Sequence, residues 1–139
     1  MSHRASGTFD VSLTPHLADE AGNGNGNDLV VGKLTIEKQF DGDLQATSKG
    51  QMLSVGTKTK GSAGYVAMEW VSGILQGLSG RFALQHSGTM TRGAPTLSIT
   101  VVPDSGTGEL AGISGRMSID IVDGKHFYTF EYTFAAIEE

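Results

Sequence analysis

The 139-residue sequence contains no cysteine and only three prolines. Without cysteine, the fold has no disulfide framework, no thiolate metal site and no thiol nucleophile. No apolar run approaches the ~18 residues that a membrane-spanning helix needs, and the first ten residues hold no apolar signal-peptide core. We therefore expect a cytoplasmic protein that does not associate with membranes.

Basic residues are also scarce, since 10 Lys and Arg against 15 Asp and Glu give a formal net charge of −5. No segment is strongly basic, so nucleic acid is not an expected partner. Glycine, in contrast, is abundant: 20 residues of 139, about twice the usual ~7%. Without a collagen period, this richness predicts turns, bulges and bent strands. The length suits one domain over residues 1–139.

Eight segments alternate apolar and polar residues with the period of two that is typical of β-strands. They are residues 6–14, 30–40, 43–53, 64–71, 81–90, 96–102, 116–122 and 125–134. No segment has a convincing helical period beyond one short turn expected near residues 107–111. Residues 15–28 include the low-complexity run GNGNGND, which cannot order itself by burial. We expect a flexible surface loop there, with a lid over the barrel as the alternative.

Two stretches of the chain are nearly the same, GILQGLSGRF (73–82) and GELAGISGRM (108–117), and a fainter copy starts at Gly42. Each interval between copies holds two predicted strands, so the repeating unit is a hairpin with glycines at its corners. Four hairpins give eight antiparallel strands, about the number that closes into a small barrel without an aqueous channel. The sequence therefore predicts an all-β, eight-stranded antiparallel up-and-down barrel built from hairpin repeats.

Several polar side chains share the predicted inward faces of these strands with aliphatic ones. A buried Lys or Glu costs free energy unless it is paired or neutralised, so such groups in one lumen are expected to share one site. We predict that Glu69 and His86 form a general acid–base pair. The predicted ligand-binding residues are Lys38, Tyr65, His126, Tyr128 and Tyr132, and Ser48 faces inward with them.

Which face of strand 64–71 points into the barrel is open to an alternative. Glu69 would face outward if Val66, Met68 and Trp70 faced inward, and the head of Lys38 could lie in water at the barrel mouth. If Glu69 does face inward, the apolar row of Val66, Met68 and Trp70 lies outside. That row would suit a subunit interface, and we expect a homo-oligomer.

The remaining site residues also have simpler interpretations. His86 could be a hydrogen-bonded core histidine, and Tyr128 and Tyr132 could be core aromatics. Glu69, His86 and His126 are suitable ligand types for a metal, but their spacing carries no signature. We therefore predict no metal site and no cofactor.

Five short stretches carry a resemblance to a known family: residues 42–43, 65–69, 82–86, 105–112, and 126–128 with Tyr132. Through them the chain, from about Gly7 to Phe134, resembles the bacterial family of the domain of unknown function 3224. That family is similar in fold to the allene oxide cyclase-like barrels, whose closed antiparallel architecture is lipocalin-like. The resemblance implies the same closure here and implies no activity and no catalytic residue.

Taken together, these features predict a barrel that binds a small, largely apolar molecule in its lumen. If the protein is catalytic, we expect a cofactor-independent isomerase or cyclase; whether it is an enzyme stays open. The alternatives are a non-catalytic ligand carrier or sensor, and a structural barrel that acts through an oligomer interface.

Overall fold

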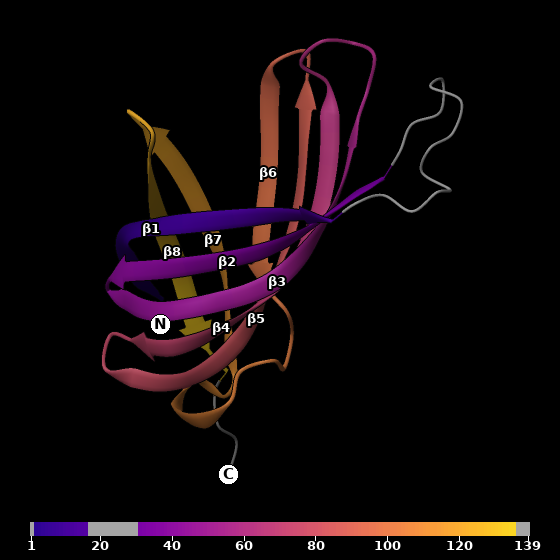
Figure 1. Cartoon of the computed structure of the whole chain (residues 1–139). Helices are drawn as coiled ribbons and strands as arrows, with labels where there is room; N and C mark the ends of the chain where they lie inside the picture. Colours follow the sequence, from indigo (N-terminus) through magenta and orange to yellow (C-terminus); the bar gives the residue numbers. More distant parts are fainter. Residues whose placement is uncertain (1, 17–30, 136–139) are drawn as a thin grey trace.

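A computed structural model describes residues 2–16 and 31–135. Its strands form a closed antiparallel barrel in sequence order, and β8 pairs with β1 to complete it (Figure 1). The strands are β1 (His3–His16), β2 (Gly32–Gly42), β3 (Leu44–Gly56), β4 (Ala63–Leu75), β5 (Leu78–Thr91), β6 (Ala94–Val101), β7 (Ile113–Val122) and β8 (Lys125–Phe134). The predicted eight-stranded antiparallel barrel is confirmed. No helix within the two described ranges is long and apolar enough to cross a membrane.

Two local predictions are clarified by the structure. The short helical turn expected near residues 107–111 is the 3₁₀ turn η2 (Gly108–Leu110). Of the loop predicted at 15–28, residues 15 and 16 belong to β1, where they pair with β2, and the rest lies outside the described residues.

The two copies of the glycine-rich stretch have equivalent structures in their second half only. Gly77 and Gly112 both have a left-handed backbone, with φ of 90° and 83°, and each directly precedes a strand, so both serve as turn residues. In the first half, Gly73 lies inside β4 whereas Gly108 begins η2. A Cβ on Gly73 would lie 2.6 Å from the Cα of Ala46, so this glycine allows two strands to approach closely.

Several strands are longer than the alternation predicts, such as β4, which extends to Leu75, whereas β8 has the predicted bounds. Gly73 and Gly80 look like strand breakers in the sequence, yet they face each other in the β4–β5 ladder. A ladder needs only backbone groups, so it continues through glycines where the side-chain pattern stops.

One end of the barrel is filled by aromatic and aliphatic side chains. Phe40, Phe82 and Phe130 are fully buried, and the rings of Phe82 and Phe130 stack at 5.6 Å. Tyr128 is also buried there, and its hydroxyl accepts a hydrogen bond from Leu44 N–H at 2.8 Å and donates to Asp41 O at 2.9 Å. This packed end supplies most of the apolar burial that stabilises the fold.

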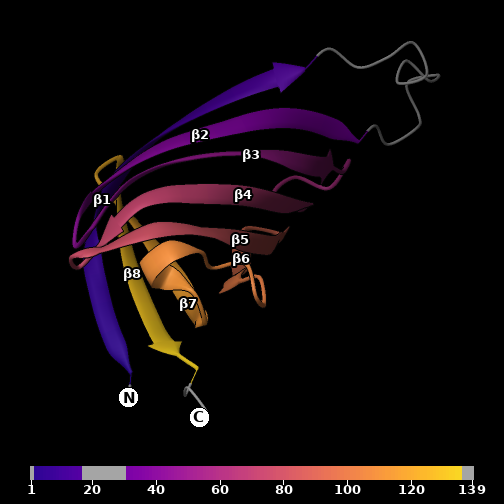
Figure 2. The same cartoon turned by 90° about the horizontal axis from the view of Figure 1, so that it is seen from below.

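The other end of the barrel is open on its inner face. β6 and β7 share only two paired positions, and the β7–β8 hairpin stands apart from the upper part of β6 (Figure 1). β7 and β8 have 10 residues each, whereas β3, β4 and β5 have 13 or 14, so the long strands continue past the hairpin as a curved sheet (Figure 2). Four apolar side chains on inward-facing positions therefore stay exposed: Leu13, Met90, Leu97 and Ile121.

Candidate functional site

Four neighbouring strands bring polar side chains together beneath the open end. Lys38 comes from β2, Ser48 from β3, Glu69 from β4 and His86 from β5, all on inward-facing positions. The residue opposite Glu69 on β3 is Gly50, which has no side chain. Glu69 can therefore reach the diagonal positions of its neighbours and, across β3, the amine of Lys38.

The Glu69 carboxylate is the centre of this cluster. Its Oε1 accepts hydrogen bonds from Lys38 Nζ at 2.9 Å and from His86 Nε2 at 2.6 Å, and its Oε2 accepts one from the Ser48 hydroxyl at 2.6 Å. The Glu69 residue is 1% exposed, so the predicted inward direction of Glu69 is the one observed. Lys38 is also buried, and its ammonium lies 5.0 Å from the centre of the Phe9 ring, a cation–π contact that partly replaces water.

The protonation states in the cluster follow from its contacts. Burial alone raises the pKa of Glu69, but the hydrogen bond from His86, the charge of Lys38 and the hydrogen bond from Ser48 outweigh burial and hold the pKa at about 2. Glu69 is therefore an anion at neutral pH and can only accept hydrogen bonds. His86 Nε2 therefore donates the hydrogen bond to Glu69, and the other ring nitrogen, Nδ1, lies on the side of Tyr65.

Tyr65 connects the cluster to the open end. Its hydroxyl lies 3.4 Å from His86 Nδ1, a long contact that leaves the hydroxyl free to turn to another partner. Burial, and after it the negative charge of Glu69, raise the pKa of Tyr65. The phenol is therefore protonated at neutral pH. A chain of polar groups thus runs from Lys38 and Ser48 through Glu69 and His86 to Tyr65.

A cavity of about 480 Å³ lies directly above this chain, within the ~300–1,000 Å³ typical of small-molecule sites. Tyr65 lines it, and none of the described residues around it is charged. Its apolar lining side chains are Met52, Ala63, Met90, Pro95, Leu97 and Ile121, and its hydroxyl-bearing ones besides Tyr65 are Ser54, Thr89 and Thr96. The cavity can therefore hold a mainly apolar molecule with one polar group at Tyr65.

Three predicted ligand-binding residues do not line this cavity. The ring of His126 packs 5.0 Å from the ring of Phe9, on the wall that also covers Lys38. Tyr128 closes the β2–β3 turn through the hydrogen bonds described above. Tyr132 donates its hydroxyl to the side chain of Gln76 at the packed end. The structure thus brings together Lys38, Tyr65, Glu69 and His86, and not the other three.

No three His, Cys, Asp or Glu side chains within residues 2–16 and 31–135 are grouped so that they could hold a metal ion. The Glu69–His86–His126 alternative considered from the sequence is therefore not formed.

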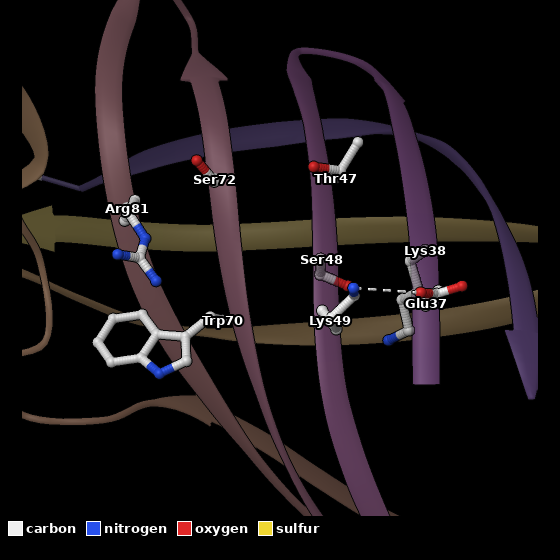
Figure 3. A pocket seen from close by; sticks show the side chains of 8 residues that line it. All are labelled: Glu37, Lys38, Thr47, Ser48, Lys49, Trp70, Ser72 and Arg81. Carbon is white, nitrogen blue, oxygen red and sulfur yellow. Dashed lines mark ion pairs between the residues drawn. The ribbon is translucent and has the colours of Figure 1, made fainter. Parts of the chain in front are cut away.

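The outer surface of β2–β5 carries a second hollow, of about 400 Å³ (Figure 3). Its charged side chains already have partners: Lys49 pairs with Glu37 at 3.6 Å, and the Arg81 guanidinium lies 4.7 Å from the centre of the Trp70 ring. The apolar row that was expected on the outer face lies beside it. Its members Trp70, Met68 and Val66 are 45%, 50% and 52% exposed. Lys38 and Ser48 also line this hollow, but their side chains are hydrogen-bonded to Glu69 on the inner face, so we place the candidate site inside the barrel.

The fold and the site define a class of protein: a small antiparallel β-barrel with one packed end, one open end and a buried charged cluster between them. The family model described as "Protein of unknown function (DUF3224)" matches residues 5–132, and the chain belongs to this family. A crystal structure of a protein with unknown function from the DUF3224 family of Shewanella oneidensis MR-1 is similar to it, at 46% identity and a TM-score of 0.89, with 98% of this chain and 100% of that chain covered. No curated protein matches this chain significantly.

The sequence predicted a ligand-binding lumen but not the position of the cavity along the barrel. Four residues of the cavity wall lie on inward-facing positions of their strands, which by itself indicates a filled core: Met52, Met90, Leu97 and Ile121. The missing signal is strand length: a β7–β8 hairpin shorter than β3–β5 must leave inner surface uncovered. Strand ends are the part of a sequence pattern that is hardest to place.

Proposed function

We propose that this protein binds a small, largely apolar molecule in the cavity at the open end of its barrel. The observation that carries the proposal is the contrast between the two ends. One end is filled, whereas inward-facing Met90, Leu97 and Ile121 remain exposed around an uncharged cavity. Exposed apolar surface that lies on the inside of a fold is the usual property of a ligand site. A hydroxyl or carbonyl group of the ligand would bind the Tyr65 hydroxyl.

A titration with the neutral, polarity-sensitive dye Nile red tests this proposal. Leu97→Arg puts a charge into the cavity and should weaken dye binding about tenfold or more. Val66→Arg is the matched control, because Val66 is similarly exposed but lies on the outer face of β4. Equal binding by all three proteins, or a loss in Val66→Arg alone, would contradict the proposal.

A second candidate function is proton transfer on the bound molecule, as in a cofactor-independent isomerase or cyclase. The polar chain from Glu69 to Tyr65 favours it. Tyr65 would take a proton from a carbon next to a substrate carbonyl while its own proton passes to His86 Nδ1. Glu69, already bonded to Nε2, would stabilise the imidazolium. Return of the proton to another carbon completes an isomerisation, and the enzyme ends unchanged.

Deuterium exchange into 2-decanone in D₂O tests this chemistry without knowledge of the natural substrate. We expect the wild-type protein to speed exchange next to the carbonyl, and Tyr65→Phe and His86→Gln to abolish the effect. Ser54→Ala, which changes the cavity wall but not the polar chain, should retain it. Exchange no faster than in buffer, with the ketone bound, would favour a non-catalytic carrier or sensor.

The structural alternative rests on the outward row of Val66, Met68 and Trp70, which supports the homo-oligomer expected from the sequence. Sedimentation velocity of the wild-type protein and Met68→Glu tests it. A dimer that dissociates in Met68→Glu would support the oligomer, and a wild-type monomer at high concentration would exclude it. The cytoplasmic location remains a prediction from the sequence.

A further inference from the structure

The rim of the cavity is formed by two turns that are bonded to each other. One is the β3–β4 connection, residues 57–62, and the other is the β5–β6 turn at Arg92 and Gly93. Gly93 N–H donates to Gly61 O at 3.0 Å, and Arg92 N–H donates to Ser62 Oγ at 2.9 Å. Within the first turn, the Thr57 hydroxyl donates to Ser62 O at 2.8 Å. These bonds hold the two turns together as one rim.

This rim adjoins the cavity directly. Ala63, which lines the cavity, follows Ser62 in the chain, and Pro95, which lies across Met90 from Ala63, comes two residues after Gly93. The residues of the rim are therefore close to the end of a molecule that fills the cavity.

The rim carries positive charge only. Lys58 and Lys60 lie in the first turn and Arg92 in the second, all three exposed. Residues 57–62 and 91–94 contain no Asp or Glu. Three of the ten Lys and Arg residues of a chain with net charge −5 are thus gathered at the edge of an uncharged cavity. All three cations would attract an anionic group at this edge. An apolar chain attached to that group would fill the cavity behind it.

We infer that the ligand of this cavity is an amphiphile, with an apolar body inside the barrel and a carboxylate or phosphate that contacts Lys58, Lys60 and Arg92. The inference rests on the proposed binding function and adds the charge of the ligand. We assign the anion to a free amphiphile rather than to a membrane surface, because the two turns that carry the three cations adjoin a cavity of small-molecule size.

Displacement of Nile red by dodecanoate and by dodecanol tests the inference, because the two compounds share a chain and differ in charge. In Lys58→Gln/Lys60→Gln/Arg92→Gln, dodecanoate should bind about tenfold more weakly than to the wild type, and dodecanol should change by less than about twofold. The control Lys33→Gln/Lys49→Gln/Arg81→Gln removes the same charge from the outer face and should alter neither. The preference for dodecanoate should also shrink as salt is raised from about 20 mM to about 500 mM.

Other results would overturn this inference, the proposed function or the assignment to a free amphiphile. If dodecanol binds and the rim variant leaves dodecanoate unchanged, or weakens both compounds equally, the rim does not recognise an anion and only this inference fails. If neither compound displaces the dye from the wild type, the proposed function fails with it. If the rim variant abolishes co-sedimentation with phosphatidylglycerol vesicles but not dodecanoate binding, the anion belongs to a lipid surface and the assignment to a free amphiphile is overturned.

Discussion

At the scale of single residues, the charge on Glu69 depends on three neighbours. A carboxylate that is 1% exposed is tolerated because Lys38 balances its charge and His86 and Ser48 complete its hydrogen bonds. No described buried side-chain N or O atom lacks a hydrogen-bond partner. Removal of one charged member should therefore destabilise the fold more than removal of Lys38 and Glu69 together.

We predict that Glu69→Gln lowers the free energy of unfolding by about 3–5 kcal/mol, because Lys38 is left buried without its counter-charge. The double variant Lys38→Met/Glu69→Gln should recover most of that loss, because neither charge is then buried. Glu37→Gln, which breaks an exposed ion pair to Lys49, should cost less than about 1 kcal/mol. Urea unfolding measures all three, and a double variant no more stable than Glu69→Gln would contradict the paired-charge account.

The same carboxylate predicts a pH dependence of stability. The folded pKa of about 2 lies below the usual 4.5, so the contribution of Glu69 is complete above pH 4.5 and is lost as the pH falls towards 2. The loss amounts to about 3 kcal/mol. We expect the wild-type protein to lose this stability over that range relative to Lys38→Met/Glu69→Gln. Parallel pH profiles of the two proteins in urea unfolding would show that the pKa of Glu69 is not depressed.

At the scale of strands, the site depends on Gly50 in β3. A Cβ at position 50 would lie 2.6 Å from the Cα and 2.7 Å from the Cβ of Glu69, and it would also meet Met68 O. The glycine thus provides the space in which Glu69 turns towards Ser48 and Lys38. Side-chain alternation alone does not show this role, because a glycine in a strand pattern is equally consistent with a bulge.

We predict that Gly50→Ala destabilises the protein by at least about 2 kcal/mol, because the new methyl group forces the β3 and β4 backbones apart. Gly56→Ala is the control in the same strand, because a Cβ at position 56 would have no other atom within 4 Å. It should change stability by less than about 1 kcal/mol. Thermal unfolding compares the two variants. Equal effects would mean that the β3–β4 ladder can absorb a methyl group beside Glu69.

The strand pattern in the sequence predicted the direction of the side chains well and the ends of several strands poorly. Alternation in residues 64–71 placed Tyr65 and Glu69 inside, as observed. Alternation could not distinguish the polar residues of the site from Tyr128 and Tyr132, because those tyrosines also lie on inward-facing positions. Which inward residues meet depends on position along the barrel, and register sets that position.

At the scale of the whole molecule, the seam between β6 and β7 is the weakest part of the barrel. Only Ile99 with Met117 and Thr100 with Arg116 are paired across it, whereas β3 and β4 are paired from Leu44 to Gly56. Fewer shared hydrogen bonds mean a lower free energy of local opening. The seam also borders the open end, so its opening would widen the cavity.

We predict that the amides of β6 and β7 that face the seam exchange with D₂O faster than those in the centre of β3 and β4. Opening free energies should differ by about 2 kcal/mol or more. Hydrogen exchange followed by NMR measures both regions in one sample. Equal protection at the seam and in β3–β4 would show that the barrel opens only by global unfolding.

The claim on which the account depends most is that the open end, and not the packed end or the outer face, receives an apolar molecule. Methionine methyl NMR tests it directly, because Met52 and Met90 line the cavity, Met117 lies in the packed core and Met68 lies on the outer face. During titration with dodecanol we predict saturable shifts of the Met52 and Met90 methyl signals, with Met117 and Met68 unchanged. A shift of Met68 alone, or no shift of Met52 and Met90 at saturating dodecanol, would contradict the account.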